Sequence, residues 1–244
     1  AGAQVGKFQM LDADGMYPAG SKEHALVKDY ELPREWLPRL KEACDAVSLE
    51  FMCTAFIPEH VPLINPYVQR HKIASFEARR GDLLRACRAT EKPLIVSTGT
   101  LSQRETWDLE KRLLPRDTML YCVSKYPADP SDYDLRVLEE WGGDPEEQES
   151  CAFGLSDHTP PRTHTAAVMA VALGASLIET HVVLGWAQES PDAHFARGPV
   201  GTLALYVRAI HEAESMMGDG IKQPAAGELV QYRYDPATGK LGTA

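Results

Sequence analysis

The feature that most constrains this chain is a regular alternation of short apolar runs with amphipathic stretches. Runs typical of buried strands lie at 4–9, 49–56, 71–75, 93–99, 118–127, 151–157 and 176–184. Stretches with helical spacing separate most of them, at 32–47, 80–90, 102–114, 134–143 and 162–175. Parallel strands need such crossovers, so the alternation predicts an α/β protein with a parallel sheet.

The spacing of the strands favours one particular α/β architecture. It is close to the rhythm of a (β/α)8 TIM barrel whose first strand is absent or hidden. We therefore predict one barrel domain over residues 1–218, ending in a helix, and a peripheral turn-rich tail over 219–244. An open doubly wound sheet is the alternative, although no glycine-rich phosphate motif follows any predicted strand.

Charge and cysteine content exclude several classes of protein. A net charge of −10 argues against nucleic-acid or anionic-membrane partners, which select basic surfaces. The five cysteines are odd in number and lack CxxC spacing, which favours reduced thiols in a cytoplasmic protein. No apolar run approaches the length of about 20 residues that a membrane span needs.

Polar side chains stand at the carboxyl ends of the predicted strands. In a barrel these ends share one face, where the chemistry takes place, so the side chains there predict a polar pocket. The residues in question are Lys7, Gln9, Thr54, Lys72, Ser75, Glu77, Ser97, Thr98, Ser124, Lys125, Ser156, Asp157, His158 and His181.

Two histidines follow consecutive predicted strands. His158 and His181 are 23 residues apart, the length of one βα unit, so both imidazoles are expected to face one point above the barrel. Converging neutral imidazoles suit a divalent metal, with a carboxylate or water completing the shell. The alternative is a pair of hydrogen-bonded strand-end histidines with no ligand.

Two lysines interrupt otherwise apolar strands. An inward-facing Lys7 or Lys72 must be paired or must face an anion, and with serine hydroxyls such as Ser97 it would hold a phosphate and a carboxylate. Salt bridges to Glu77 and Asp157 are one alternative. A Schiff-base lysine is another, because lysines at barrel strand ends also fill that role.

Eight sequence pieces resemble one known family. "AGAQVGKFQ", "FMCTAF", "HKIASFE", "KPLIVSTGT", "YCVSKYPADP", "GLSDHT", "ALGASLIETHVVL" and "SPDAHFA" occur in the order and spacing of the N-acetylneuraminate (sialic acid) synthase family. That family includes the legionaminic and pseudaminic acid synthases and spore-coat polysaccharide relatives. The resemblance extends from the N-terminus to about residue 196.

The resemblance implies a fold and a reaction. The implied enzyme is a TIM barrel that condenses phosphoenolpyruvate with an open-chain N-acylhexosamine of the N-acetylmannosamine type, releasing phosphate and a nine-carbon 2-keto acid. A Mn²⁺ or Mg²⁺ ion held by His158 and His181 is implied as well. A homodimer is possible, because the family is dimeric.

The resemblance also implies roles for individual residues. Lys72, Glu77 and Asp192 are predicted to be catalytic. The substrate-binding residues that it implies are Lys7, Gln9, Thr54, Lys72, Ser75, Ser97 and Ser156. We add Ser124 to this group because its hydroxyl also stands at a strand end, where it could help to hold a phosphate and a carboxylate.

Proteins of this family have a first strand and a C-terminal antifreeze-like domain that find no counterpart in this sequence. We therefore expect a barrel that lacks both. Two other functions stay open. One is a Schiff-base aldolase or lyase of similar sugars. The other is a catalytically silent barrel that serves as a binding or scaffold protein.

Overall fold

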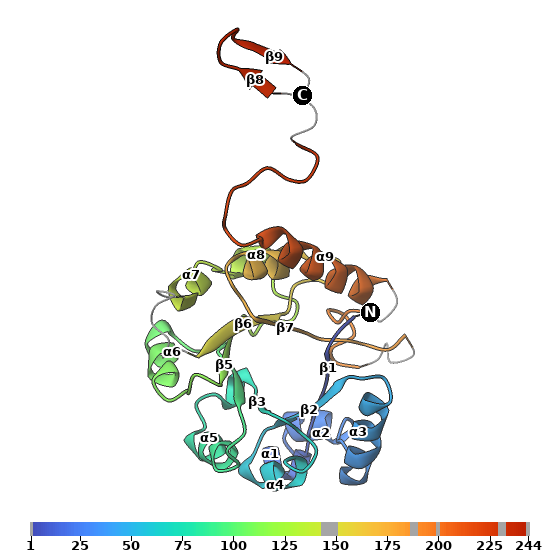
Figure 1. Ribbon diagram of the computed structural model, residues 1–244. Helices are drawn as coiled ribbons and strands as arrows, with labels where there is room; N and C mark the ends of the chain where they lie inside the picture. The colour runs from blue at the N-terminus through green and yellow to red at the C-terminus, as the bar shows by residue number, and fades with distance from the viewer. Residues whose placement is uncertain (1, 143–150, 186–189, 199–200, 229–232, 243–244) are drawn as a thin grey trace.

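Seven parallel strands form one curved sheet in the computed structural model (Figure 1), which describes residues 2–142, 151–185, 190–198, 201–228 and 233–242. The strands are hydrogen-bonded in their order along the chain, from β1 to β7. Their bounds are β1 Val5–Gln9, β2 Glu50–Ala55, β3 His71–Ile73, β4 Leu94–Ser97, β5 Thr118–Cys122, β6 Ala152–Asp157 and β7 Leu177–Thr180.

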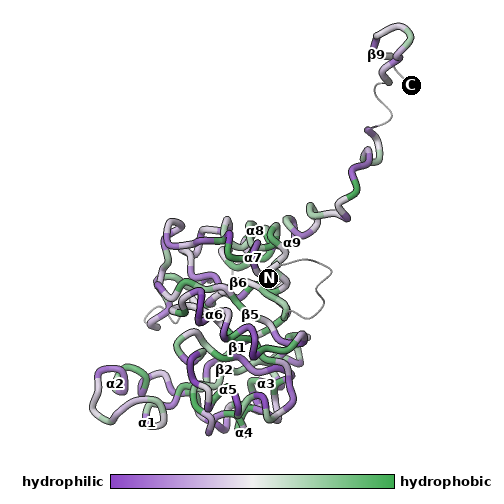
Figure 2. The backbone as a smooth tube through the Cα atoms, turned by 90° about the vertical axis from the view of Figure 1, so that its left-hand side faces the viewer, coloured by the Kyte–Doolittle hydropathy of each residue, from purple (hydrophilic) through white to green (hydrophobic). Residues whose placement is uncertain are grey.

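Helices lie around the outside of this sheet (Figure 1). The α-helices are α1 Ala13–Met16, α2 Lys22–Lys28, α3 Leu37–Asp45, α4 Val61–Ile64, α5 Gly81–Arg88, α6 Gln103–Glu110, α7 Val137–Gly142, α8 Thr165–Ala172 and α9 Thr202–Met217. Short 3-10 helices occupy η1 Arg34–Trp36, η2 Pro58–His60, η3 Ser75–Glu77 and η4 Pro130–Asp132. Helices α1 and α2 stand out to one side of the body in Figure 2, and no α2 residue is buried.

The structure confirms the α/β class and all seven predicted strands. The doubly wound alternative is wrong, because the strands follow one another without the order reversal of that fold. Within the described residues this sheet has no eighth strand, and β1 and β7 form its two edges. The sheet curves far enough for the two edges to meet through side chains, since Lys7 on β1 and Glu179 on β7 form an ion pair at 3.5 Å.

Side-chain alternation along the strands divides the core from the pocket. Successive strand residues point to opposite faces. Phe51 and Cys53 pack outward with the helices in the main core, whereas Met52 packs inward with Ile95 and Leu120 in a small second cluster. Two residues further along these three strands the inward positions are polar, as Thr54, Ser97 and Cys122. The interior is therefore apolar in one layer and polar in the layer nearest the carboxyl ends.

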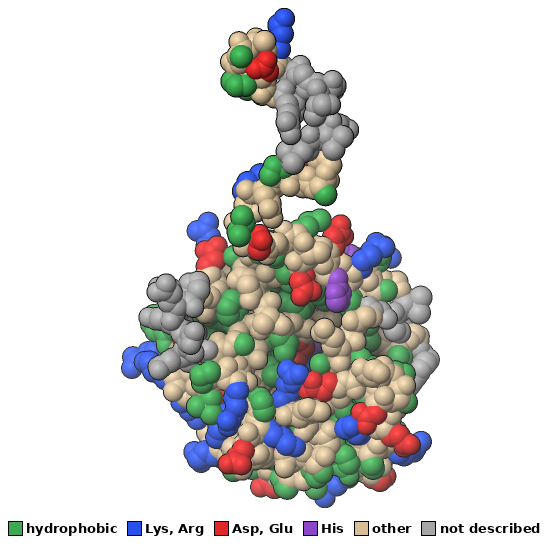
Figure 3. Space-filling model, viewed as in Figure 1, with side chains coloured by type: hydrophobic (Ala, Val, Ile, Leu, Met, Phe, Trp, Pro, Cys, Tyr) green, Lys and Arg blue, Asp and Glu red, His purple; other side chains and the backbone are tan. Residues whose placement is uncertain are grey.

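The chain after α9 continues as an exposed segment over residues 218–228, and β8 Arg233–Asp235 pairs with β9 Lys240–Gly242 in a separate hairpin. All five cysteines are free thiols, four of them buried. Within the described residues no helix is both long and apolar enough to cross a bilayer. On the face drawn in Figure 3, basic and acidic side chains are interspersed among the described residues.

Candidate active site

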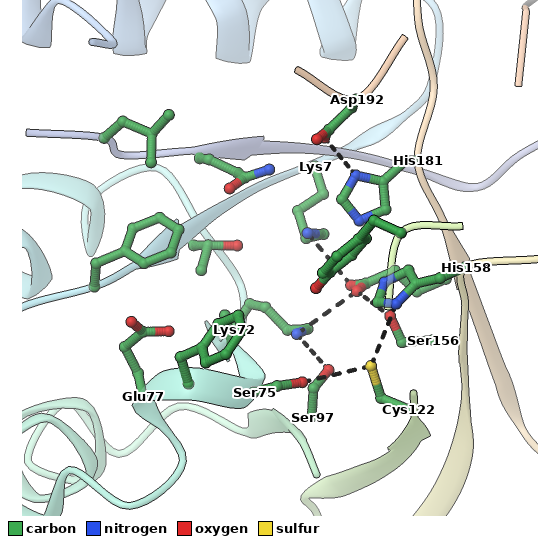
Figure 4. A pocket seen from close by; sticks show the side chains of 18 of the residues that line it. Lys7, Lys72, Ser75, Glu77, Ser97, Cys122, Ser156, His158, His181 and Asp192 are labelled. Atoms are coloured by element: carbon green, nitrogen blue, oxygen red, sulfur yellow. Dashed lines mark hydrogen bonds and ion pairs between the residues drawn. The ribbon is translucent and has the colours of Figure 1, made fainter. Parts of the chain in front are cut away.

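A pocket of about 270 Å³ opens at the carboxyl ends of the strands. Every residue that was predicted to be catalytic, substrate-binding or metal-binding lines this pocket except Ser124 (Figure 4). Thr98, Lys125 and Asp157, which were also expected at the strand ends, do not line it. The predicted residues that line it are Lys7, Gln9, Thr54, Lys72, Ser75, Glu77, Ser97, Ser156, His158, His181 and Asp192. The parallel sheet explains this convergence, because all its strands end on one face.

A buried carboxylate joins the two predicted lysines. Glu179 Oε2 lies 3.5 Å from Lys7 Nζ, and its Oε1 lies 3.6 Å from Lys72 Nζ. Ser156 donates a 2.9 Å hydrogen bond to the same Oε1. Lys72, which is only 2% exposed, also donates to Ser97 Oγ at 2.7 Å. The pocket floor is thus a network of two ammonium groups, one carboxylate and two hydroxyls.

Burial and charge act against each other in this network. Burial lowers the pKa of Lys72, and the nearby Glu179 carboxylate opposes that shift. Burial alone would raise the pKa of Glu179, but the charges of Lys7 and Lys72 and the Ser156 hydrogen bond hold it well below its usual range. Glu179 is therefore ionised at neutral pH and stabilises the charged lysines.

The alternative prediction, that Lys7 and Lys72 form salt bridges with Glu77 and Asp157, is wrong because both lysines pair with another carboxylate. Asp157 pairs with Arg197 instead, and Lys72 with Glu179. Glu179 was not among the predicted site residues, although its position in the sequence carries a signal. It stands two residues before His181, so strand alternation places both side chains on the same face.

The two predicted metal-binding histidines do lie together. The His158 and His181 ring centroids are 5.1 Å apart. His158 Nδ1 is 2.7 Å from the Val123 carbonyl oxygen. His181 Nδ1 is 2.7 Å from Asp192 Oδ2 (Figure 4). An acceptor at Nδ1 fixes the proton there and leaves a lone pair on Nε2. This is the hydrogen-bonded form in which imidazoles bind metals, and it fits a divalent cation.

The histidine pair is not a complete metal site by itself. Among the described residues, no three His, Cys, Asp or Glu side chains are placed to hold an ion. Burial would raise the pKa of Asp192, but its hydrogen bond to His181 lowers it, so Asp192 is a charged acceptor for that imidazole. The remaining coordination positions would fall to water or substrate oxygens.

Aromatic side chains missed by our sequence analysis enclose the imidazoles. The Tyr126 ring centroid is 4.4 Å from that of His158, and the Phe195 centroid is 4.9 Å from that of His181. Phe195 is almost fully buried, whereas Tyr126 lines the pocket. These rings restrict how far either imidazole can rotate and exclude water from its side.

Ser124 is the predicted substrate-binding residue that does not line the pocket. Its Oγ lies behind Gly99, where an added Cβ would be 2.2 Å away from it and 2.8 Å from Ser75 Oγ. A side chain at Gly99 would therefore displace both hydroxyls. Cys122, which the sequence analysis did not select, lines the pocket instead and contacts Ser75 Oγ at 3.4 Å and His158 Nδ1 at 3.7 Å.

The half of the pocket above β1, β2 and β3 differs from the half that carries the histidines. It is lined by the apolar or aromatic residues Leu11, Met16, Tyr17, Phe56 and Phe76. Glu77 lies on this side, across the pocket from His181 in Figure 4. Burial raises the pKa of Glu77, and its Oε2 has no hydrogen-bond partner within the described residues. Glu77 does not cap α5, whose N-cap is Arg80.

Comparison with known families identifies the chain. The model of the NeuB family matches residues 1–222. The chain belongs to the NeuB family. The predicted family is therefore confirmed.

Relatives of this NeuB-family chain are named synthases. It is 29% identical to the N,N'-diacetyllegionaminic acid synthase of Legionella pneumophila, over 94% of this chain and 69% of the relative. It is 31% identical to a pseudaminic acid synthase of Campylobacter jejuni, over 90% and 68% of the two chains. These names support the prediction that the chain is an enzyme of the sialic-acid synthase type.

The fold comparison agrees. The crystal structure of the N-acetylneuraminic acid synthetase from Leptospira borgpetersenii, in complex with citrate, superposes with a TM-score of 0.81 at 25% identity. The match covers 93% of this chain and 78% of that one. The seven-stranded sheet is thus the sheet of a NeuB-family synthase.

Proposed function

We propose that this NeuB-family enzyme condenses phosphoenolpyruvate with an open-chain N-acylated amino sugar to give a nine-carbon 2-keto acid and phosphate. In this reaction C3 of phosphoenolpyruvate bonds to the sugar aldehyde carbon, water adds at C2, and phosphate leaves as its bond to C2 breaks. The observation that carries the proposal is the union of two lysines, several hydroxyls and a histidine pair in one pocket.

The floor of the pocket suits the phosphate and carboxylate of phosphoenolpyruvate. Lys7 and Lys72 supply positive charge, and Ser97 and Ser156 supply hydroxyls within their network. Thr54 Oγ1 is buried and has no hydrogen-bond partner within the described residues, so it is available to a ligand. Donors fixed before the substrate arrives stabilise charge that develops on it during the reaction.

The histidine pair would hold the divalent metal that the family resemblance implies. His158 and His181 would be its protein ligands through Nε2, because both Nδ1 atoms already face acceptors. When bound, Mn²⁺ or Mg²⁺ would polarise the sugar aldehyde and orient water. Asp192 keeps the His181 ring in position, and Phe195 and Tyr126 limit its movement.

The charges of the pocket favour an acceptor sugar without a phosphate group. Lys7 and Lys72 are the cationic side chains among the described lining residues, and both already face Glu179. The half above β1 to β3 offers apolar contacts and the Glu77 carboxylate, which would accept from a hydroxyl or amide N–H and repel a phosphate.

One observation favours a second candidate function. Burial lowers the pKa of Lys72, and a lysine with a depressed pKa is suited to Schiff-base formation with a keto acid. Borohydride reduction in the presence of a keto-acid substrate would label such an enzyme covalently. The synthase we propose would remain unlabelled and would be sensitive to chelators.

The test of the proposed function is phosphate release from phosphoenolpyruvate by the purified protein with Mn²⁺, across N-acylated mannosamine-type sugars. Release that requires both the sugar and the metal supports the synthase. Release without a sugar, or no release from a folded protein that binds Mn²⁺, contradicts it. A cytoplasmic location and a homodimer remain predictions.

A further inference from the structure

A buried arginine and aspartate lie directly behind the histidine pair. The side chains of Arg197 and Asp157 are 1% and 0% exposed, and Arg197 Nη2 lies 3.1 Å from Asp157 Oδ2. They belong to different parts of the chain, since Asp157 ends β6 and precedes His158, whereas Arg197 follows the segment that carries Asp192. Neither lines the pocket.

Arg197 connects several elements at once. Its guanidinium donates to the Thr163 carbonyl at 2.9 Å and to Thr159 Oγ1 at 3.2 Å, and it also contacts Thr180 Oγ1 on β7. The same group lies 3.8 Å from the ring centroid of Tyr206 on α9. A planar guanidinium donates hydrogen bonds in several fixed directions at once, and an ammonium group is less suited to this.

The Asp157 side of the pair reaches the backbone of His158. Tyr133 donates its hydroxyl proton to Asp157 Oδ1 at 3.2 Å, and the same hydroxyl oxygen accepts from His158 N at 3.0 Å. Tyr206 donates to Asp157 Oδ2 at 2.7 Å. The carboxylate thereby fixes the hydroxyl that holds the His158 backbone.

The Arg197 side of the pair reaches His181. Arg197 N donates to the His181 carbonyl at 2.9 Å, and the Arg197 carbonyl accepts from Val183 N at 3.1 Å. The segment that ends at Arg197 also supplies Asp192, which contacts His181 Nδ1, and Phe195, which packs on the His181 ring. Because Arg197 anchors this segment in the core, it fixes the position of Asp192 and Phe195 beside the His181 ring.

We propose that Arg197 and Asp157 form a positioning pair that holds His158 and His181 in the arrangement needed to bind a divalent cation. The inference rests on the proposed metal site but concerns residues that touch neither metal nor substrate. Groups that orient ligating histidines typically change metal affinity by roughly 10- to 100-fold when removed.

Three variants test the pair. In Arg197→Met, Asp157 is left as a buried unpaired charge, so both the free energy of unfolding and Mn²⁺ affinity are expected to fall. In the double variant Asp157→Asn with Arg197→Met, stability should largely recover because no buried charge remains, whereas Mn²⁺ affinity should stay roughly 10- to 100-fold low. Arg197→Lys should retain part of the affinity.

A control is available at another ion pair whose aspartate is buried. Arg88 contacts the fully buried Asp117, which lies just before the amino end of β5, at the opposite end of the strands from the pocket. Arg88→Met should lower stability without changing Mn²⁺ affinity. If Mn²⁺ affinity, measured by electron paramagnetic resonance, instead follows stability in all these variants, Arg197 is merely structural and the inference is overturned.

A second measurement separates this inference from the metal site itself. In ¹⁵N-histidine NMR spectra of the metal-free protein, the hydrogen-bonded Nδ1 protons of His158 and His181 should be visible in the wild type. They should be lost or shifted in the double variant. If the wild type binds no Mn²⁺, the metal site fails and these signals alone decide the positioning role. Unchanged signals in the double variant would overturn it.

Discussion

Lys7 and Glu179 form an ion pair across the two edges of the sheet, with 3.5 Å between Nζ on β1 and Oε2 on β7. Glu179 also faces Lys72, so one carboxylate compensates two ammonium groups in the floor of the pocket. In the proposed reaction, bound phosphoenolpyruvate places further negative charge next to these two lysines. Whether Glu179 and phosphoenolpyruvate interact with the same lysines can be measured.

Glu179→Gln is expected to destabilise the protein by roughly 3 kcal/mol, because it leaves a buried lysine without its counter-charge. Phosphoenolpyruvate should restore more stability to this variant than it adds to the wild type. Urea unfolding with and without the ligand measures both effects. Equal stabilisation of the two proteins by the ligand would show that Glu179 and phosphoenolpyruvate do not share the lysines.

Lys72→Met is expected to lower kcat/KM for phosphoenolpyruvate by at least about 100-fold while the protein stays folded, since a preorganised charge at the substrate is lost. Lys125→Met is the matched control. Lys125 also follows a strand, but it is exposed, pairs with Asp129 and Asp132, and does not line the pocket. Similar losses in both variants would contradict a specific role for Lys72.

His181→Ala is expected to abolish metal-dependent turnover with little change in the fold, because one of two imidazole ligands is removed. Asp192→Asn should weaken Mn²⁺ binding by roughly 10- to 100-fold, since the hydrogen bond to His181 Nδ1 loses its charged acceptor. Steady-state kinetics and Mn²⁺ titration measure these effects. His211→Ala, at an exposed position of α9, is the control. Full turnover in His181→Ala would remove the metal-site assignment.

The acceptor without a phosphate group is expected to be the better substrate. An N-acylated mannosamine should have a kcat/KM at least about 100-fold above that of its 6-phosphate, because the phosphate would meet Glu77 and apolar side chains. Glu77→Gln should narrow this ratio by removing the repelling carboxylate. Parallel kinetics with the two sugars give the answer, and a preference for the phosphate ester would refute the acceptor class.

The free energy of unfolding should decrease as the pH is lowered, because of a buried histidine outside the pocket. Burial lowers the pKa of His71 from about 6.5 to about 4, and its Nδ1 has no hydrogen-bond partner within the described residues. The unfolded chain therefore binds this proton first, and stability is lost as pH falls from about 6.5 to about 4. The expected loss is about 3 kcal/mol, at about 1.4 kcal/mol for each pKa unit.

His71→Phe provides the comparison for this prediction. The variant also lacks the 3.1 Å hydrogen bond from His71 Nε2 to Asn65, so it should be less stable at neutral pH. Its stability should nevertheless change less between pH about 6.5 and about 4. Denaturant unfolding across that range is the measurement, and parallel curves for the two proteins would assign the pH dependence to other groups.

Patterns in the amino-acid sequence were enough to predict the seven strands, their parallel arrangement and 11 of the 20 residues that line the pocket. Side-chain alternation and the shared carboxyl-end face of a parallel sheet are local rules, and they placed Lys72, Ser97 and His158 correctly. The same rules would have found Glu179 from its spacing to His181. They could not show that Ser124 lies behind Gly99 rather than at the pocket.

The partners of the buried charges become visible only in the folded chain. Lys7 meets Glu179 because the sheet curves until its edges face each other, and Arg197 meets Asp157 because the segment after β7 folds back onto β6. These partners are separated by 172 and 40 residues in the numbering, that is 179 − 7 and 197 − 157. Such pairings depend on curvature and long-range packing, which no local pattern of residues specifies.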